Sequence, residues 1–143
     1  MSDIVLPIHL ILLALTAICV VLADVYGLAW ILGKKQLLNE KTVLRLHYAV
    51  TIGLTGMIAT GILLFWPVRE YLTNQSNSFL PKMIFVLALV INSFVIEKHI
   101  RVTTTKKFVD VSAKEKRVLF ISGAISLVGW VGAFFSAFLQ LPG

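Results

Sequence analysis

Among the ionisable side chains in the apolar stretches of this sequence, five stand out as groups that could carry chemistry. They are His9, Asp24, His47, Lys82 and His99. An ionisable group inside an apolar segment is costly to bury, so each is a candidate functional residue. Imidazole is a common axial ligand of haem iron, and lysine can pair with a haem propionate. The residue types therefore suggest a haem site as one hypothesis, with Asp24 as a separate group that could accept a proton or bind a cation.

The histidines form two groups by their distance from basic residues. His47 follows Arg45 by two residues and His99 precedes Arg101 by two, so both reach the same depth on neighbouring antiparallel helices. This placement is typical of bis-histidine haem ligation in a helix bundle, although imidazoles near an interface can also simply be solvated. His9 lies near the opposite end, at about the depth of Lys82.

At that opposite end His9 alone could ligate a haem iron, with Lys82 pairing with a propionate. The alternative is an interfacial histidine beside a lysine that extends its ammonium group to the membrane surface. The sequence leaves both interpretations open.

A second set of polar residues is expected near the middle of the bilayer. Asp24 precedes Lys34 by ten residues and Asn92 precedes Arg101 by nine, which places both about 14 Å from the basic boundary. The hydroxyl residues at similar depth are Thr51, Thr55 and Ser126. One interpretation is a hydrogen-bonded cluster that fixes the helix register, with Asp24 as the partner of Asn92. The other is a carboxylate that takes up a proton or a cation.

Four apolar runs must position all of these residues. They cover about 6–33, 43–67, 79–100 and 118–141. Each is near or above the ~20 residues that a helix needs to cross the hydrocarbon core. The connections between them are short, which favours antiparallel packing of sequence neighbours. The sequence therefore predicts an all-α fold, an integral membrane four-helix up-down bundle, with residues 1–143 forming a single transmembrane domain.

The distribution of charge predicts the orientation of this bundle. Eleven of the thirteen basic residues follow the first or the third run, and only Arg69 and Lys82 lie on the other side. Basic loops stay in the cytoplasm, so both termini are expected outside it, in a bacterial inner membrane. The same explanation accounts for the net charge of +6 without nucleic acid as a partner.

Small or polar residues mark the helix faces that are expected to pack. In the fourth run they are Ser122, Ser126, Gly129, Ala133, Ser136 and Gln140, and in the second Ala49, Gly53, Gly56 and Thr60. Small side chains let helix backbones approach closely in lipid. These faces are expected to serve packing within the bundle, or contact with a second copy or a larger membrane complex. At the start of the fourth run, Ser112 and Glu115 have the spacing of a capping box.

At a few positions the chain resembles small bacterial four-helix membrane proteins, including the HemJ-type protoporphyrinogen oxidases and CopD-like copper-resistance membrane domains. The matching points are His9, His47 with the stretch 47–53 after it, and Lys82 within 79–83. The resemblance implies haem b ligated by His9, with Lys82 essential nearby. The arginine-containing signature that ends the first helix in the HemJ family is absent, and Asn92 stands about where a third-helix histidine is expected. The resemblance therefore does not carry oxidase activity over.

Three functions follow as hypotheses. The first is a small haem-b-binding membrane protein for electron transfer or tetrapyrrole handling. The second is a membrane scaffold or subunit without enzymatic activity, acting through its small-residue faces. The third is a transporter-like bundle that takes up protons at Asp24.

Overall fold

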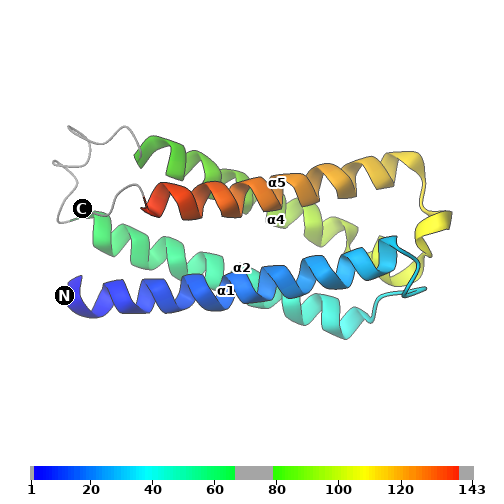
Figure 1. Ribbon diagram of the computed structural model, residues 1–143, viewed down its shortest axis with the longest axis horizontal. Coiled ribbons are helices and arrows are strands. Elements are labelled where there is room, and N and C mark those ends of the chain that lie inside the picture. Colours follow the sequence, from blue (N-terminus) through cyan, green and yellow to red (C-terminus); the bar gives the residue numbers. More distant parts are fainter. Residues whose placement is uncertain (1, 67–78, 139–143) are drawn as a thin grey trace.

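Four long antiparallel helices make up most of the protein (Figure 1). The computed structural model describes residues 2–66 and 79–138. The helices are α1 (Ser2–Ile31), α2 (Glu40–Phe65), α4 (Phe79–Thr105) and α5 (Ala113–Phe138), and a short 3-10 helix, η2 (Phe108–Asp110), lies between α4 and α5. α1 begins and α5 ends at the same end of the molecule, while the α1–α2 and α4–α5 connections lie at the other end. The predicted all-α four-helix bundle is confirmed.

Each of the four helices is long and apolar enough to cross a membrane. The qualifying segments are Ile4–Ile31, Glu40–Phe65, Lys82–Thr105 and Ala113–Phe135, of 28, 26, 24 and 23 residues. Large apolar side chains on all four helices point away from the bundle; Ile52, for example, is 71% exposed. In water such a surface would aggregate, whereas in lipid it is the expected exterior. The chain is therefore a multi-pass membrane protein.

At the end that carries the basic loops, α2, α4 and α5 extend beyond the apolar runs, whereas α1 ends at Ile31, two residues before its run does. α2 begins at Glu40 instead of residue 43 because the Asn39 side chain accepts a hydrogen bond from the Thr42 N–H. α5 begins at Ala113 instead of residue 118, directly after Ser112. The predicted capping box of Ser112 and Glu115 is confirmed. The Ser112 N–H donates to Glu115 Oε2 at 3.0 Å, and the Glu115 N–H donates to Ser112 Oγ at 3.2 Å. Hydropathy missed these turns because helix formation continues through polar residues once the terminal N–H groups are satisfied.

The bundle consists of two hairpins. In the first hairpin α1 packs along α2, in the second α4 packs along α5, and α2 and α4 join the hairpins through a smaller contact. Glycines bring the paired helices close together, because a Cβ at Gly53 would collide with Thr16, and one at Gly129 would lie 2.8 Å from Leu89 Cδ2. The prediction that these small residues serve helix packing is confirmed at both glycines.

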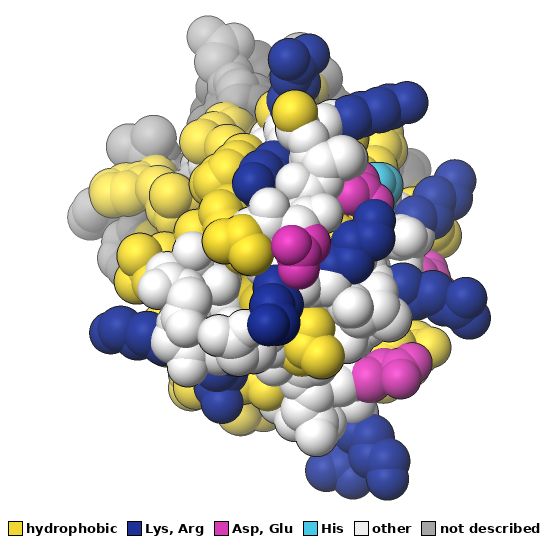
Figure 2. All heavy atoms as spheres, turned by 90° about the vertical axis from the view of Figure 1, so that its right-hand side faces the viewer, with side chains coloured by type: hydrophobic (Ala, Val, Ile, Leu, Met, Phe, Trp, Pro, Cys, Tyr) yellow, Lys and Arg dark blue, Asp and Glu magenta, His cyan; other side chains and the backbone are white. Residues whose placement is uncertain are grey.

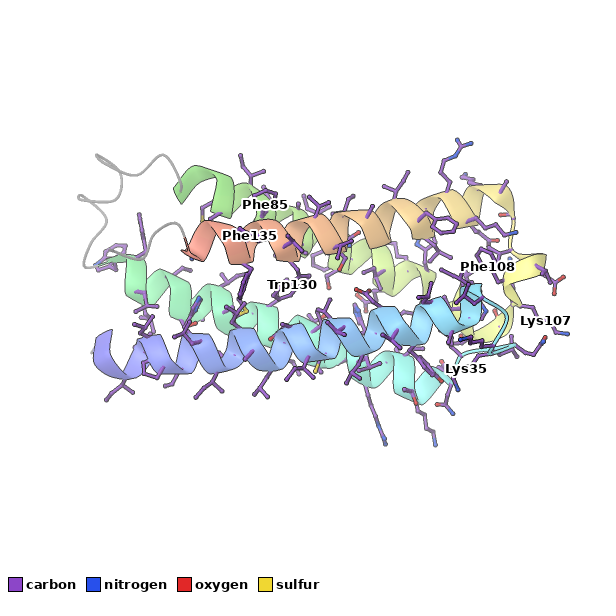
Figure 3. The ribbon with its side chains drawn as sticks, viewed as in Figure 1. Lys35, Phe85, Lys107, Phe108, Trp130 and Phe135 are labelled. Atoms are coloured by element: carbon purple, nitrogen blue, oxygen red, sulfur yellow. The ribbon has the colours of Figure 1, made fainter. Side chains whose placement is uncertain are left out.

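The loop end of the bundle is closed by a buried apolar cluster. Trp30, Leu38 and Val111 are 2%, 6% and 4% exposed and pack together with Phe108 beside them. Two hydrogen bonds join the hairpins here: the Trp30 Nε1–H donates to the Lys106 carbonyl oxygen, and the Leu38 N–H donates to the Thr103 carbonyl oxygen, both at 3.0 Å. The outer surface of this end is rich in lysine and arginine (Figure 2). Lys35, Lys107 and Phe108 lie here, whereas Phe85 and Phe135 lie toward the opposite end (Figure 3).

Candidate functional site

A cavity of about 230 Å³ lies between the two hairpins, above the apolar cluster at the loop end. All four helices contribute to its wall. The lining surface is mainly apolar, and the polar or ionisable residues that contribute to it are Asp24, Tyr26, His47, His99, Thr103, Ser122 and Ser126. An apolar cavity with a few converging polar groups is the usual form of a small-molecule site.

His47 and His99 line this cavity from two different helices, as their equal depths predicted. His47 comes from α2 and His99 from α4, and both side chains are half-buried. His99 Nδ1 lies 2.8 Å from the Val95 carbonyl oxygen one turn earlier, which can only accept, so Nδ1 carries the proton. Metal-ligating histidines almost always hold their second ring nitrogen in this way, which leaves Nε2 as a lone-pair donor. The fixed tautomer therefore makes His99 a competent metal ligand.

Asp24 lines the same cavity from α1, and its side chain is exposed at the cavity's edge. Within residues 4–66 and 82–135, no hydrogen bond or ion pair joins its carboxyl group to another residue. A carboxyl group inside a membrane span normally pairs with another group or faces a water-filled space. Asp24 is therefore available to a ligand, a cation or a proton in the cavity.

Asn92 forms its hydrogen bonds with α5 and not with Asp24. The Ser122 Oγ–H donates to Asn92 Oδ1 at 2.7 Å, and the Asn92 Nδ2–H donates to the Ser122 carbonyl oxygen at 2.9 Å. Both residues are buried. This corrects the expectation that Asp24 is the partner of Asn92: α4 packs closely against α5, whereas Asp24 lies on α1 in the other hairpin.

The remaining members of the predicted midplane layer are divided between different places. Thr51 on α2 lies 3.2 Å from Ser93 on α4, hydroxyl to hydroxyl, and Ser126 faces the cavity. Thr55 is exposed, and its hydroxyl donates to the Thr51 carbonyl oxygen. The structure therefore resolves the expected layer into a buried α4–α5 pair, an α2–α4 contact and a group of cavity-lining residues.

His9 and Lys82 both lie toward the opposite end of the bundle. His9 Nδ1 is 2.7 Å from Thr60 Oγ1, and because that hydroxyl donates to the Gly56 carbonyl oxygen, the imidazole Nδ1–H is the donor to Thr60. His9 stands in the third turn of α1 and Lys82 in the first turn of α4, which begin at the same end of the bundle, away from the histidines of the cavity.

Sequence reasoning missed three residues whose hydroxyl groups contact predicted site residues. Thr60 holds His9, Ser122 holds Asn92, and Ser93 meets Thr51. Thr60 and Ser122 stood out only as small residues on packing faces, and their partners became visible once the helix rotations were known.

Within the described residues, no three His, Cys, Asp or Glu side chains come together as a metal-binding group. No protein-family model, curated protein or solved structure gives a match to this chain.

Proposed function

We propose that this multi-pass membrane protein binds haem b in the cavity between its hairpins, with His47 and His99 as ligands of the iron. Its role would then be electron transfer or tetrapyrrole handling. The observation that carries the proposal is that two imidazoles from facing antiparallel helices line one largely apolar cavity.

The donor set and the lining of the cavity suit this cofactor. His99 has one ring nitrogen fixed by Val95 and the other available, and the aliphatic wall suits a flat apolar macrocycle. The volume is more restrictive, because 230 Å³ is below the ~300–1,000 Å³ of pockets that enclose drug-sized ligands. A tetrapyrrole would therefore extend beyond the cavity or require the hairpins to move apart. Haem bound there would supply one-electron redox chemistry.

The proposal includes an orientation in the membrane. The loop end carries the lysines and arginines of both connections, so we place it in the cytoplasm of a bacterial cell, with the ends of α1 and α5 on the opposite side of the inner membrane. The cavity then lies in the cytoplasmic half of the bilayer.

A visible absorption spectrum tests haem binding directly. Protein purified from haem-replete cells should show a Soret band and, when reduced, sharp α and β bands typical of bis-histidine haem. His47→Ala and His99→Ala should each abolish or convert this low-spin spectrum. His9→Ala is the matched control and should leave it intact.

The other outcomes also discriminate. Loss of haem in His9→Ala and Lys82→Ala, with His47→Ala unchanged, would move the site to the opposite end of the bundle, where the family resemblance implies it. Substoichiometric haem that no histidine substitution alters would reject the proposal.

A second function, proton uptake at Asp24, is favoured by the absence of a protein partner for its carboxyl group in the described part of the chain. Asp24→Asn keeps the size of the side chain and removes its charge. If Asp24 takes up protons, this variant should keep its thermal stability but lose proton transport driven by a pH gradient across proteoliposomes. Equal transport by wild type and Asp24→Asn would reject this role.

A further inference from the structure

The cavity has one side on which the bundle is open. α1 pairs with α2, α4 pairs with α5, and the hairpins meet chiefly through α2 and α4. The remaining pair of neighbours, α1 and α5, makes few contacts, although both helices line the cavity. The side between α1 and α5 is therefore where the interior can communicate with the surroundings.

Two glycines line the cavity from the two helices that border this side. Gly27 on α1 and Gly123 on α5 both line the cavity, and a Cβ built on either would meet no atom within 4 Å. Glycines that serve helix packing behave differently in the same molecule: a Cβ at Gly56 would lie 3.1 Å from Leu12 and one at Gly132 2.6 Å from Phe85. Gly27 and Gly123 are thus not required for close packing, and their missing side chains leave open space at the cavity wall.

The alternative route, from the loop end, is blocked. Leu38 forms the floor of the cavity and belongs to the buried cluster with Trp30 and Val111. The hydrogen bonds from Trp30 to Lys106 and from Leu38 to Thr103 hold the two connections together at this end of the cavity. Water-soluble molecules approaching the basic surface therefore meet a packed layer.

The surroundings of the opening are lipid. Leu28 on α1 is 51% exposed, and Phe120 on α5 is 54% exposed. Exposed aliphatic and aromatic side chains at this depth contact acyl chains. Asp24 is the exception, since it is also exposed and lines the cavity between these apolar neighbours. A carboxyl group at the lipid boundary is explained by a path for a ligand that carries a polar group.

We infer that the cavity receives its ligand sideways from the bilayer, through the gap between α1 and α5 at Gly27 and Gly123. The ligand class is a flat, membrane-dissolved amphiphile, whose polar group passes Asp24 on its way to the histidines. Such a ligand can exceed the cavity volume, because part of it remains in the gap. The identification of the ligand as haem rests on the proposed function, whereas the position of the opening does not.

A nitroxide label tests the opening without reference to haem. In a Cys19→Ala background, a spin label attached at Ser126→Cys faces the cavity. Two relaxing agents are compared by how often they collide with the label: oxygen, which dissolves in lipid, and a charged nickel chelate, which stays in water. In nanodiscs, oxygen should be the stronger relaxing agent, and Gly27→Leu or Gly123→Leu should reduce its effect several-fold. Ala14→Leu and Ala124→Leu are the matched controls, because both alanines are exposed on the same helices and do not line the cavity.

Dominant relaxation by the nickel chelate would show access from water and overturn the inference. Oxygen relaxation that neither leucine substitution reduces would overturn it as well. Gly27→Ala and Gly123→Ala, retaining wild-type accessibility and thermal stability, would show that the leucine effect is one of obstruction and not of unfolding.

Haem transfer tests the ligand. Vesicles carrying protohaem in their bilayer are mixed with protein in nanodiscs, and the growth of the Soret band is followed. The leucine variants should bind haem several-fold more slowly with an unchanged final spectrum, while the control variants match wild type. Equal rates for all variants would overturn lateral entry of haem. Absence of any Soret band in wild type would reject the proposed function but not the opening, which the spin label measures independently.

Discussion

Asn92 and Ser122 show how a single polar pair is used inside this bundle. Their two hydrogen bonds join α4 to α5 where both side chains are at most 5% exposed. A buried polar group in a membrane protein is costly unless its partner is present, so the pair fixes the rotation of the two helices relative to each other. That rotation also turns Ser122 and Ser126 toward the cavity.

A double-mutant cycle should detect this pair. Ser122→Ala leaves Asn92 Oδ1 without its donor, and Asn92→Leu removes both hydrogen bonds. The coupling free energy of unfolding is expected to lie between about 0.6 and about 1.7 kcal/mol, the average and the largest value for hydrogen bonds between membrane helices. Asp24→Leu combined with Asn92→Leu should be additive, since the two residues lie in different hairpins. Coupling of similar size between Asp24 and Asn92 would contradict the pairing described above.

Glycine substitutions should divide into two classes at the residue scale. Gly53→Ala should destabilise the protein by about 1–3 kcal/mol, because the new Cβ collides with the β-branched side chain of Thr16, which cannot move aside easily. Gly27→Ala should be neutral or stabilise by up to about 1 kcal/mol, because alanine favours helix and meets no atom within 4 Å. Thermal unfolding in detergent, followed by circular dichroism, compares the two; equal destabilisation would show that Gly27 is also packed.

At the scale of elements, the two connections behave as one structure. The α1–α2 connection contributes Leu38, the α4–α5 connection contributes Val111, and Trp30 at the end of α1 packs between them. Backbone and side-chain hydrogen bonds to the carbonyl oxygens of Thr103 and Lys106 tie the hairpins together at this end. The α2–α4 contact is smaller than the contacts within each hairpin, so this cluster provides much of what holds the hairpins in register.

Removing the indole of Trp30 should therefore loosen the whole loop end. Trp30→Ala is expected to cost about 3–5 kcal/mol of unfolding free energy, the range for a large aromatic side chain deleted from a packed interior. Phe94→Ala is a suitable comparison, because Phe94 is 63% exposed on α4 and should cost much less. Thermal unfolding monitored by circular dichroism measures both. Costs of the same size would mean that the cluster does not hold the hairpins together.

At the scale of the whole molecule, charge and hydropathy act together. Apolar side chains cover the outside of all four helices, and the basic residues gather over the loop end (Figure 2). A lipid bilayer satisfies both features, since the helices lie in hydrocarbon and the lysines and arginines reach the headgroups. The cavity, the histidines and Asp24 are then all within the part of the protein that lipid surrounds.

The orientation can be tested with reporters. A periplasm-active reporter fused after Gly143 should be active, and a cysteine introduced at Asn77 should react with a membrane-impermeant reagent added to intact spheroplasts. A cysteine replacing Ser112, next to the basic residues, should be protected until the membrane is permeabilised. The reverse pattern would place the basic loops outside and move the cavity to the outer half of the bilayer.

The sequence by itself determined the elements and their order. Four apolar runs and short connections predicted four antiparallel spans, the spacing of Ser112 and Glu115 predicted the start of α5, and residue depth placed His47 and His99 at one level and His9 near the level of Lys82. These properties follow from the chain's local length and polarity, because lipid imposes the same requirement on every segment that crosses it.

Only the tertiary structure decided the partners of each side chain. Asn92 pairs with Ser122, Asp24 is left without a protein partner in the described residues, and Thr55 faces outward. Depth along a helix can be counted in the sequence, but rotation about the helix axis depends on which faces pack. Here that is set by the fit of Gly53 against Thr16 and of Gly129 against Leu89, which bind the helices into two hairpins and leave α1 and α5 apart. The cavity and its open side arise from that arrangement, because they are spaces between helices that no single segment encodes.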